Sequence, residues 1–416
     1  MIKFVFFCMM CLGAFVPAQA QNESQAPAEP LIEDSANFIR AYLMVGEASH
    51  LYPQCAFGHA FLRLQSPPNN LDYCFSMESG KFEGFFDICL GNYPNRLVPV
   101  PTAVYLKNFD NEGRAVTAYP LDITLEEGQR LWKLLDNTAL AGISPYHDFF
   151  HHGCSHEIIA LLEKGVGGQI VFGKGAREYD GTLFTLGDRL LAFNSPMRLP
   201  PFMLMTTDGS DRQLSDMDKT TFPTILPTIL GDATIVKPDG TRHGLFKQGA
   251  EPVVFRPKQT IVNTAWPFYL WFGLLLLLTV VACGLVLLLP RQWSVRLADV
   301  WGVVLFVLYN VLTFILLFFC LFSSLPTIHG WNWNFLVYNL VPLGVWLVSL
   351  FRPFSDRLWR RIHLGYALWL CAFMVVMWAW GGHQIMEQYL LVGTFAAYCF
   401  FRWMRPSPVS CSQPES

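Results

Sequence analysis

Five long apolar segments in the C-terminal part of the chain most constrain its fold. They are Trp266–Leu289, Val300–Ser323, Asn334–Phe351, Leu364–Trp380 and Ile385–Phe401. Each has about the 17 to 25 residues that a helix needs to cross a bilayer, and none carries a charge in its middle. The sequence therefore predicts an all-α bundle of five transmembrane helices over residues 266–403.

The arginines between these segments predict the orientation of the chain. They follow the first, third and fifth segments, as Arg291, Arg296, Arg352, Arg357, Arg360, Arg361, Arg402 and Arg405. The alternate loops, 324–333 and 381–384, contain neither Lys nor Arg. Because positively charged loops stay in the cytoplasm, we expect the residues before Trp266 outside the cytoplasm and the tail, 404–416, inside it.

The N-terminus predicts the same orientation independently. Lys3 precedes an apolar run, Phe4–Val16, and residues 18–20 form an A-x-A site, so residues 1–20 resemble a signal peptide too short to span a bilayer. Residues 21–36 are polar and rich in Pro, Ala and Glu, which predicts a flexible leader. The chain is therefore expected in the bacterial inner membrane, with residues 37–258 as a periplasmic domain.

The periplasmic domain has the pattern of a mixed α and β fold. Thr124 to Glu127 form a capping box that opens a helix through Leu140, and residues 237–240 predict a hairpin turn. The net charge of −3 and the lack of a basic patch argue against a nucleic acid partner. The expected strands are Ala41–Gly46, Phe57–Leu64, Leu71–Met77 and Ala115–Ile123, and the second and third form a hairpin.

Cys154 is the candidate nucleophile of this domain. It lies where an amphipathic helix is expected to begin, and the positive end of a helix dipole favours a thiolate. His59, near the start of a predicted strand, is the candidate base. An imidazole in such a pair needs an orienting partner. Alternation on the next strand offers three candidates whose register cannot be read from the sequence: Asp72, Ser76 and Glu78.

Other interpretations of these residues remain open. A single Cys at a helix start is often only a small buried hydrophobe. A metal site is a rival, but no second ligand cluster accompanies the first, so we predict no metal and no cofactor. The residues of that cluster are His147, His151, His152, Cys154 and His156, and the cysteines that remain for a disulfide are Cys55, Cys74 and Cys89.

The outer loop Thr327–Asn334 is dense in His, Asn and Trp. Such a loop is typical of an interfacial aromatic belt. It is also suited to binding a phospholipid headgroup, for which His329, Asn332 and Asn334 are the candidates.

Four stretches resemble the Lnb N-terminal periplasmic domain family. They are Phe57–Leu64, Asp72–Ser76, Leu131–Asp136 and Tyr146–Ser155. The order of a strand His before a helix Cys is also similar to that of permuted papain-like enzymes such as lecithin retinol acyltransferase. The resemblance implies an α+β permuted papain-like fold, with His59 as base and Cys154 as nucleophile. Many relatives have Asn before the Cys, where this chain has Gly153.

The resemblance further implies a lipoprotein N-acyltransferase. A phospholipid would be the acyl donor, and a diacylglyceryl-cysteine lipoprotein would accept the chain on its N-terminal amine. Two alternatives stay open: a papain-like envelope amidase or peptidase acting on peptidoglycan, and a non-catalytic membrane scaffold or transport protein.

Overall fold

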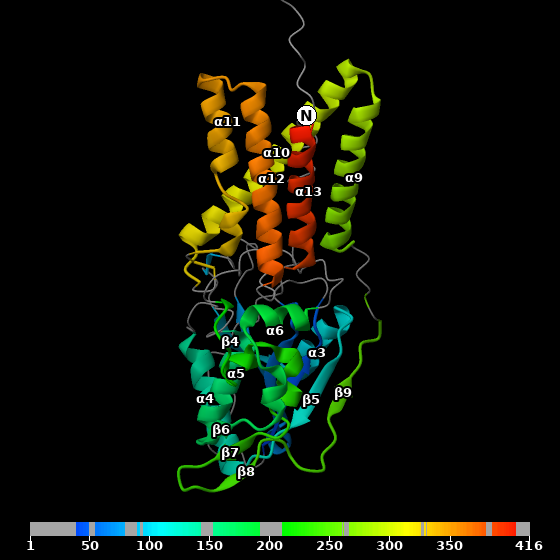
Figure 1. Ribbon diagram of the computed structural model, residues 1–416. Helices are drawn as coiled ribbons and strands as arrows, with labels where there is room; N and C mark the ends of the chain where they lie inside the picture. Colours follow the sequence, from blue (N-terminus) through cyan, green and yellow to red (C-terminus); the bar gives the residue numbers. More distant parts are fainter. Residues whose placement is uncertain are drawn as a thin grey trace, which may run out of the picture.

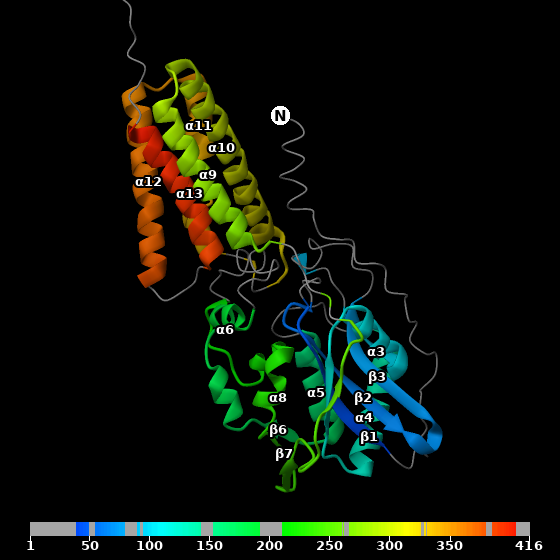
Figure 2. The same cartoon turned by 90° about the vertical axis from the view of Figure 1, so that its right-hand side faces the viewer.

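The computed structural model describes two parts, an N-terminal domain rich in β-sheet and a C-terminal region of long helices (Figures 1 and 2). The expectations for residues 1–36, for the tail beyond Met404, and for Cys89, His147, His151 and His152 lie outside the described residues. The described residues are 39–49, 55–79, 90–91, 95–142, 153–191, 210–259, 261, 266–325, 328–329, 331–379 and 385–404.

A six-stranded antiparallel sheet is the centre of the N-terminal domain, in the order β4-β3-β2-β1-β5-β9. The predicted hairpin is confirmed: β2 and β3 pair across a short turn in which Asn70 is left-handed. The strands are β1 (Arg40–Gly46), β2 (His59–Ser66), β3 (Leu71–Ser79), β4 (Asn95–Pro101), β5 (Val116–Pro120) and β9 (Val253–Phe255).

Helices cover both faces of this sheet because the strand side chains alternate between the two faces. Leu62 and Phe75 pack with α4 (Leu125–Ala141) and α5 (Cys154–Val166). Phe61 packs on the opposite face against α3 (Thr102–Asn111). The predicted capping box is present at the start of α4.

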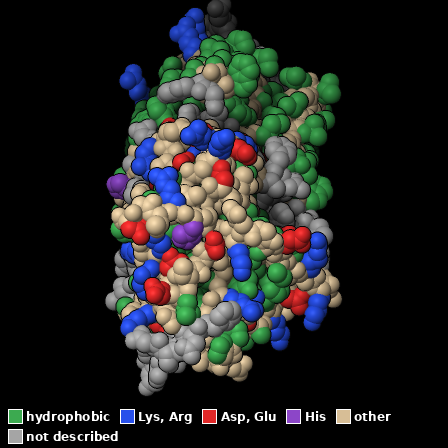
Figure 3. Space-filling model, turned by 90° about the horizontal axis from the view of Figure 1, so that it is seen from below, with side chains coloured by type: hydrophobic (Ala, Val, Ile, Leu, Met, Phe, Trp, Pro, Cys, Tyr) green, Lys and Arg blue, Asp and Glu red, His purple; other side chains and the backbone are tan. Residues whose placement is uncertain are grey.

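A smaller subdomain continues from α5. It contains α6 (Leu183–Leu190), α8 (Leu226–Ile229) and a second sheet of β6 (Gln169–Val171), β7 (Thr234–Val236) and β8 (Arg242–Gly244). The predicted turn at residues 237–240 joins β7 and β8, where the Lys237 N–H donates to the Thr241 carbonyl at 2.9 Å. Figure 3 shows acidic and basic side chains interspersed on the face seen from below, without a large patch of one sign.

The helical region follows the predicted spans. Among the described residues, four segments are long and apolar enough to cross a membrane: Phe268–Leu288, Trp293–Phe322, Trp333–Phe351 and Asp356–Ala379. The fifth predicted span forms a helix but is not among these four, so the count of five stays a prediction. The helices are α9 (Phe268–Leu288), α10 (Arg291–Phe322), α11 (Val341–Phe351), α12 (Asp356–Ala379) and α13 (Met386–Met404).

Two contacts fix which end of the N-terminal domain meets the helices. After α10, Ser324 donates from its backbone N–H and its hydroxyl to the Leu90 carbonyl, both at 2.9 Å. Just before the first span, the Lys258 N–H donates to Asp110, at the end of α3, at 2.6 Å. The end of the domain that holds the α3–β5 turn therefore faces the bundle (Figure 2).

Candidate active site

The structure brings His59 and Cys154 together at the end of the central sheet. His59 begins β2, and Cys154 begins α5, which packs against β2 and β3. The imidazole and the thiol share a hydrogen bond. The first backbone N–H groups of α5, like those of any helix, have no helical carbonyl as a partner. Gly153 is the N-cap and has no side chain that could accept a hydrogen bond from them.

Two glycines permit the close packing beside His59. A Cβ at Gly58 would lie 2.7 Å from the Gly46 carbonyl, and its φ of +92° suits glycine. A Cβ at Gly46, which pairs with His59 in the sheet, would lie 2.3 Å from the Phe109 ring. Side chains at these two positions would push the start of β2 away from its neighbours and displace the imidazole.

The charges of the pair favour a thiolate and an imidazolium. Burial acts to raise the pKa of the Cys154 thiol, but the attraction and the hydrogen bond of His59, with a hydrogen bond from Ser155, bring that pKa below its usual value. Burial acts to lower the pKa of His59, but Cys154 and the negative charge of Glu78 raise it overall. Both shifts act towards a thiolate beside an imidazolium, the charge state in which such a pair combines a nucleophile with a proton donor.

A buried chain of hydroxyl groups leads away from Nε2 of the imidazole. His59 Nε2 lies 2.8 Å from Ser76 Oγ, which is 2.8 Å from the Tyr105 hydroxyl. Tyr105 also hydrogen-bonds to Glu78, and burial and that carboxylate raise the pKa of Tyr105 well above its usual value. Because each hydroxyl carries one proton, the arrangement that satisfies every group runs from His59 to Ser76, then to Tyr105, then to Glu78.

Of the three predicted orienters, two lie at the imidazole. Ser76 contacts it directly, and the nearer Glu78 oxygen is 3.8 Å from Nε2. Asp72 does not lie at the imidazole, which corrects the prediction for this residue. Arg63 donates from Nε and Nη2 to the two oxygens of the Asp72 carboxylate, at 2.9 and 2.7 Å. Asp72 pairs with Gln65, six residues beyond His59, which is about 20 Å along a strand. Tyr105 was not predicted, because it lies on a helix that the sequence did not reveal.

The outer loop differs from the headgroup prediction. His329 is exposed, but Asn332 and Asn334 are only 0% and 1% exposed. The Asn332 side chain accepts a hydrogen bond from the Asn334 N–H at 2.8 Å and caps a short 3-10 helix, Trp333–Leu336. The two asparagines therefore stabilise the turn between spans, and only His329 is open to a headgroup.

The other cysteines of the described N-terminal domain contrast with Cys154. Cys55 and Cys74 are free thiols, and burial raises the pKa of each to about 12. Neutral thiols of this kind are poor nucleophiles. The part of the chain that the structure describes contains no group of three side chains placed to hold a metal ion.

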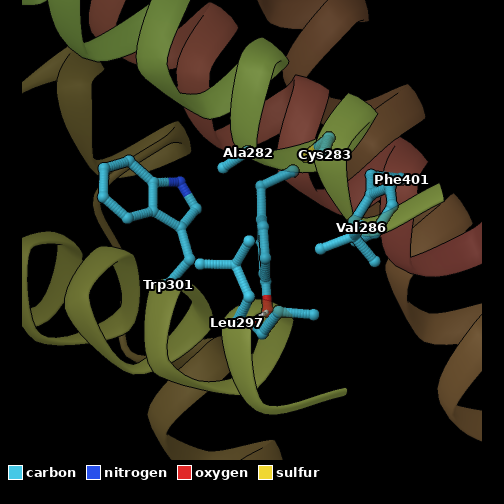
Figure 4. Close-up of a pocket in the computed structure, with 8 residues that line it drawn as sticks. Ala282, Cys283, Val286, Leu297, Trp301 and Phe401 are labelled. Atoms are coloured by element: carbon cyan, nitrogen blue, oxygen red, sulfur yellow. Dashed lines mark hydrogen bonds between the residues drawn. The ribbon is translucent and has the colours of Figure 1, made fainter. Parts of the chain in front are cut away.

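A crevice in the helical region is separate from this site. It lies between α9, α10 and α13 and is mostly apolar, with Cys283, Trp301 and Phe401 among the residues that line it (Figure 4). Its polar lining consists of Cys283, Trp301 and Tyr398, and no histidine or carboxylate is among the lining residues. Its lining is that of packed helices, and His59 and Cys154 are not part of it.

Comparison with known proteins supports the resemblance over part of the chain. Residues 40–174 match the family model of the Lnb N-terminal periplasmic domain, and this range includes both members of the dyad. The chain matches no curated protein and no solved structure. With the four candidate spans, the match identifies a membrane protein with a periplasmic N-terminal domain.

Proposed function

We propose that the chain is a membrane-bound thiol acyltransferase of the bacterial inner membrane. It moves a fatty acyl chain from a phospholipid, through a thioester on Cys154, to the N-terminal amine of diacylglyceryl-cysteine lipoproteins. The observation that carries this proposal is the coupled dyad: among the described cysteines of the N-terminal domain, Cys154 alone has a lowered pKa, and it shares a hydrogen bond with His59.

The first half of the reaction uses the resting ion pair. The Cys154 thiolate attacks the carbonyl carbon of a phospholipid ester, and the first free N–H groups of α5 can stabilise the oxyanion. The C–O bond then breaks, and the His59 imidazolium gives its proton to the leaving alkoxide. The products are an acyl thioester and a lysophospholipid.

The second half suits an amine acceptor. The lipoprotein amine attacks the thioester carbonyl, the C–S bond breaks and the thiolate leaves. His59, now neutral, takes the proton that the amine loses, which restores the ion pair. Splitting the transfer at a thioester predicts ping-pong kinetics.

The position of the dyad relative to the spans supports a lipid substrate. The Leu90–Ser324 contact joins one end of the domain to the helical region, and the Asp110–Lys258 contact, at the end of α3, holds the segment that leads to the first span. Gly46, the sheet partner of His59, packs beneath Phe109 of the same α3 end. The dyad is thus at the membrane-facing end, where phospholipid esters are found.

The test is mass spectrometry of the full-length protein in phospholipid vesicles. We expect a fatty acyl thioester on Cys154 that disappears when a peptide with an N-terminal diacylglyceryl-cysteine is added and becomes N-acylated. Cys154→Ala should give neither product, and Cys154→Ser almost none, because a hydroxyl has a far higher pKa than a thiol. Cys74→Ala, which removes a buried neutral thiol, is the matched control and should retain both products.

Two results would overturn the proposal. One is N-acylated peptide from Cys154→Ala protein that is present in the membrane in normal amount. The other is cleavage of a peptidoglycan peptide by the wild-type chain without any acyl thioester, which would favour an envelope amidase.

A further inference from the structure

Arg114 is a buried cation beside the dyad that the reaction described above does not use. It is 6% exposed and lies in the turn between α3 and β5. Its Nε donates to the Glu47 carbonyl at 2.7 Å, and its Nη1 donates to Glu112 at 2.6 Å. Its guanidinium also stacks over Phe109, 4.8 Å from the ring centre.

The remaining nitrogen of this guanidinium has little to bind. Arg114 Nη2 is buried and has no nitrogen or oxygen partner among the described residues. The guanidinium also interacts with the thiol of Cys55, which is neutral and a weak acceptor. A buried N–H without a strong acceptor destabilises the folded protein, and an anionic oxygen that accepted from it would recover that free energy.

The register of the sheet places Arg114 near the reacting atoms. His59 pairs with Gly46, and Gly46 pairs with Val116, two residues after Arg114. Two strand spacings separate His59 from Val116, roughly 10 Å. Arg114 also acts electrostatically on His59, and Cys55 is close enough to interact electrostatically with both Arg114 and Cys154.

The same turn lies at the membrane-facing end of the domain. A Cβ at Gly113 would lie 2.5 Å from the Ile261 backbone nitrogen, and residue 261 comes just before the first span. Asp110 binds the Lys258 backbone in the same place. Arg114 is therefore on the side of the domain from which the chain enters the first span.

We propose that Arg114 binds the phosphate of the donor phospholipid through Nη2 and so positions the ester at Cys154. This inference rests on the proposed acyl transfer. In a glycerophospholipid, five covalent bonds join the phosphorus to the nearer ester carbonyl carbon, a reach of roughly 6 Å. Guanidinium groups bind phosphate oxygens in a planar, charge-assisted geometry. The phosphate replaces the weak contact with Cys55.

The experiment compares a donor that has the phosphate with one that lacks the phosphate and the headgroup attached to it. Full-length protein in non-ionic detergent micelles receives dipalmitoyl-phosphatidylglycerol or dipalmitoylglycerol, and the rate of thioester formation on Cys154 is measured by intact mass. Arg114→Gln should slow the reaction of the phospholipid about ten- to a hundred-fold, the effect of losing a charged hydrogen bond. The reaction of the diacylglycerol should change less than about threefold. Arg114→Lys keeps the positive charge but lacks the forked N–H groups of a guanidinium, so its rate with the phospholipid should lie between those of wild type and Arg114→Gln.

Arg63→Gln is the matched control, because Arg63 also pairs with a carboxylate of this sheet but lies away from the dyad. It should leave the preference between the two donors unchanged. Equal losses on both donors in Arg114→Gln, or no loss on either, would overturn the phosphate site and leave the acyl transfer standing. No thioester from either donor in the wild-type protein would overturn the proposed function and this inference with it.

Discussion

Replacing Ser76 by Ala tests whether the buried hydroxyl chain positions the imidazole. Ser76 is 0% exposed, and its Oγ is 2.8 Å from both His59 Nε2 and the Tyr105 hydroxyl. Tyr105 keeps its bond to Glu78 in the variant, so the main loss is the partner of the imidazolium. A hydrogen bond to a charged group contributes about 1.5–3 kcal/mol. Thioester formation should therefore slow about ten- to a hundred-fold.

Ser66→Ala provides the matched control for Ser76→Ala. Ser66 is also 0% exposed and also makes a side-chain hydrogen bond, from Asn69 at 3.1 Å, but it lies at the other end of β2. A neutral bond of this kind contributes about 0.5–1.5 kcal/mol to stability. Ser66→Ala should lower the melting temperature without changing the rate of acylation per folded molecule.

The assay for this pair is single-turnover acylation of Cys154 over a range of donor concentrations. Ser76→Ala should lower the maximal rate and leave the half-saturating donor concentration near that of wild type, since Ser76 touches the base and not the lipid. If Ser76→Ala acylates at the wild-type rate, or if Ser66→Ala slows as much, the hydroxyl chain does not orient His59.

Three further predictions concern the dyad, the topology and the outer loop. Since the pKa of Cys154 is lowered, its thiolate should persist at pH values below the ordinary thiol pKa of about 8.5. Alkylation of Cys154 by iodoacetamide should stay fast at those pH values, and removing the imidazole of His59 should shift the pH profile of alkylation to higher pH. A reporter active only in the cytoplasm should work when fused after Pro406 and fail after Val262; the opposite pattern would contradict the predicted orientation. Asn332→Ala should lower the amount of protein in the membrane by removing a cap worth about 1 kcal/mol, whereas His329→Ala should not; equal amounts would show that the cap is dispensable.

The sequence predicted four strands of the central sheet and missed two: the very short β9 and β4, which contains two prolines. β2 and β3 have alternating apolar residues and were expected as a hairpin. β4 contains Pro99 and Pro101, which cannot donate to a sheet, and was not expected. The structure places β4 at the edge of the sheet, the position that tolerates proline. α3 begins directly after Pro101 and was missed with it, which hid Tyr105.

The residues of the site that can be identified by their type were predicted from the sequence. Those whose position depends on how the strands pair were not. A thiol at a helix start and a strand histidine were visible in the sequence, and the structure brings them together. The choice among Asp72, Ser76 and Glu78 needed the pairing of β2 with β3, which the pattern of side chains does not fix. Arg114 was hidden for the same reason, because only the pairing of β1 with both β2 and β5 brings it near His59.

The proposed reaction gives a physical reason for joining the thiol domain to the spans. A soluble enzyme would have to draw the lipid out of the bilayer to reach its ester. At about 0.8 kcal/mol for each methylene exposed to water, withdrawing one sixteen-carbon chain costs roughly 12 kcal/mol. The Leu90–Ser324 contact ties one end of the domain to the helical region, and the Asp110–Lys258 contact holds the segment that leads to the first span at the same end. A nucleophile fixed there meets the ester at the interface while the acyl chain stays in hydrocarbon, so binding energy can go to the transition state.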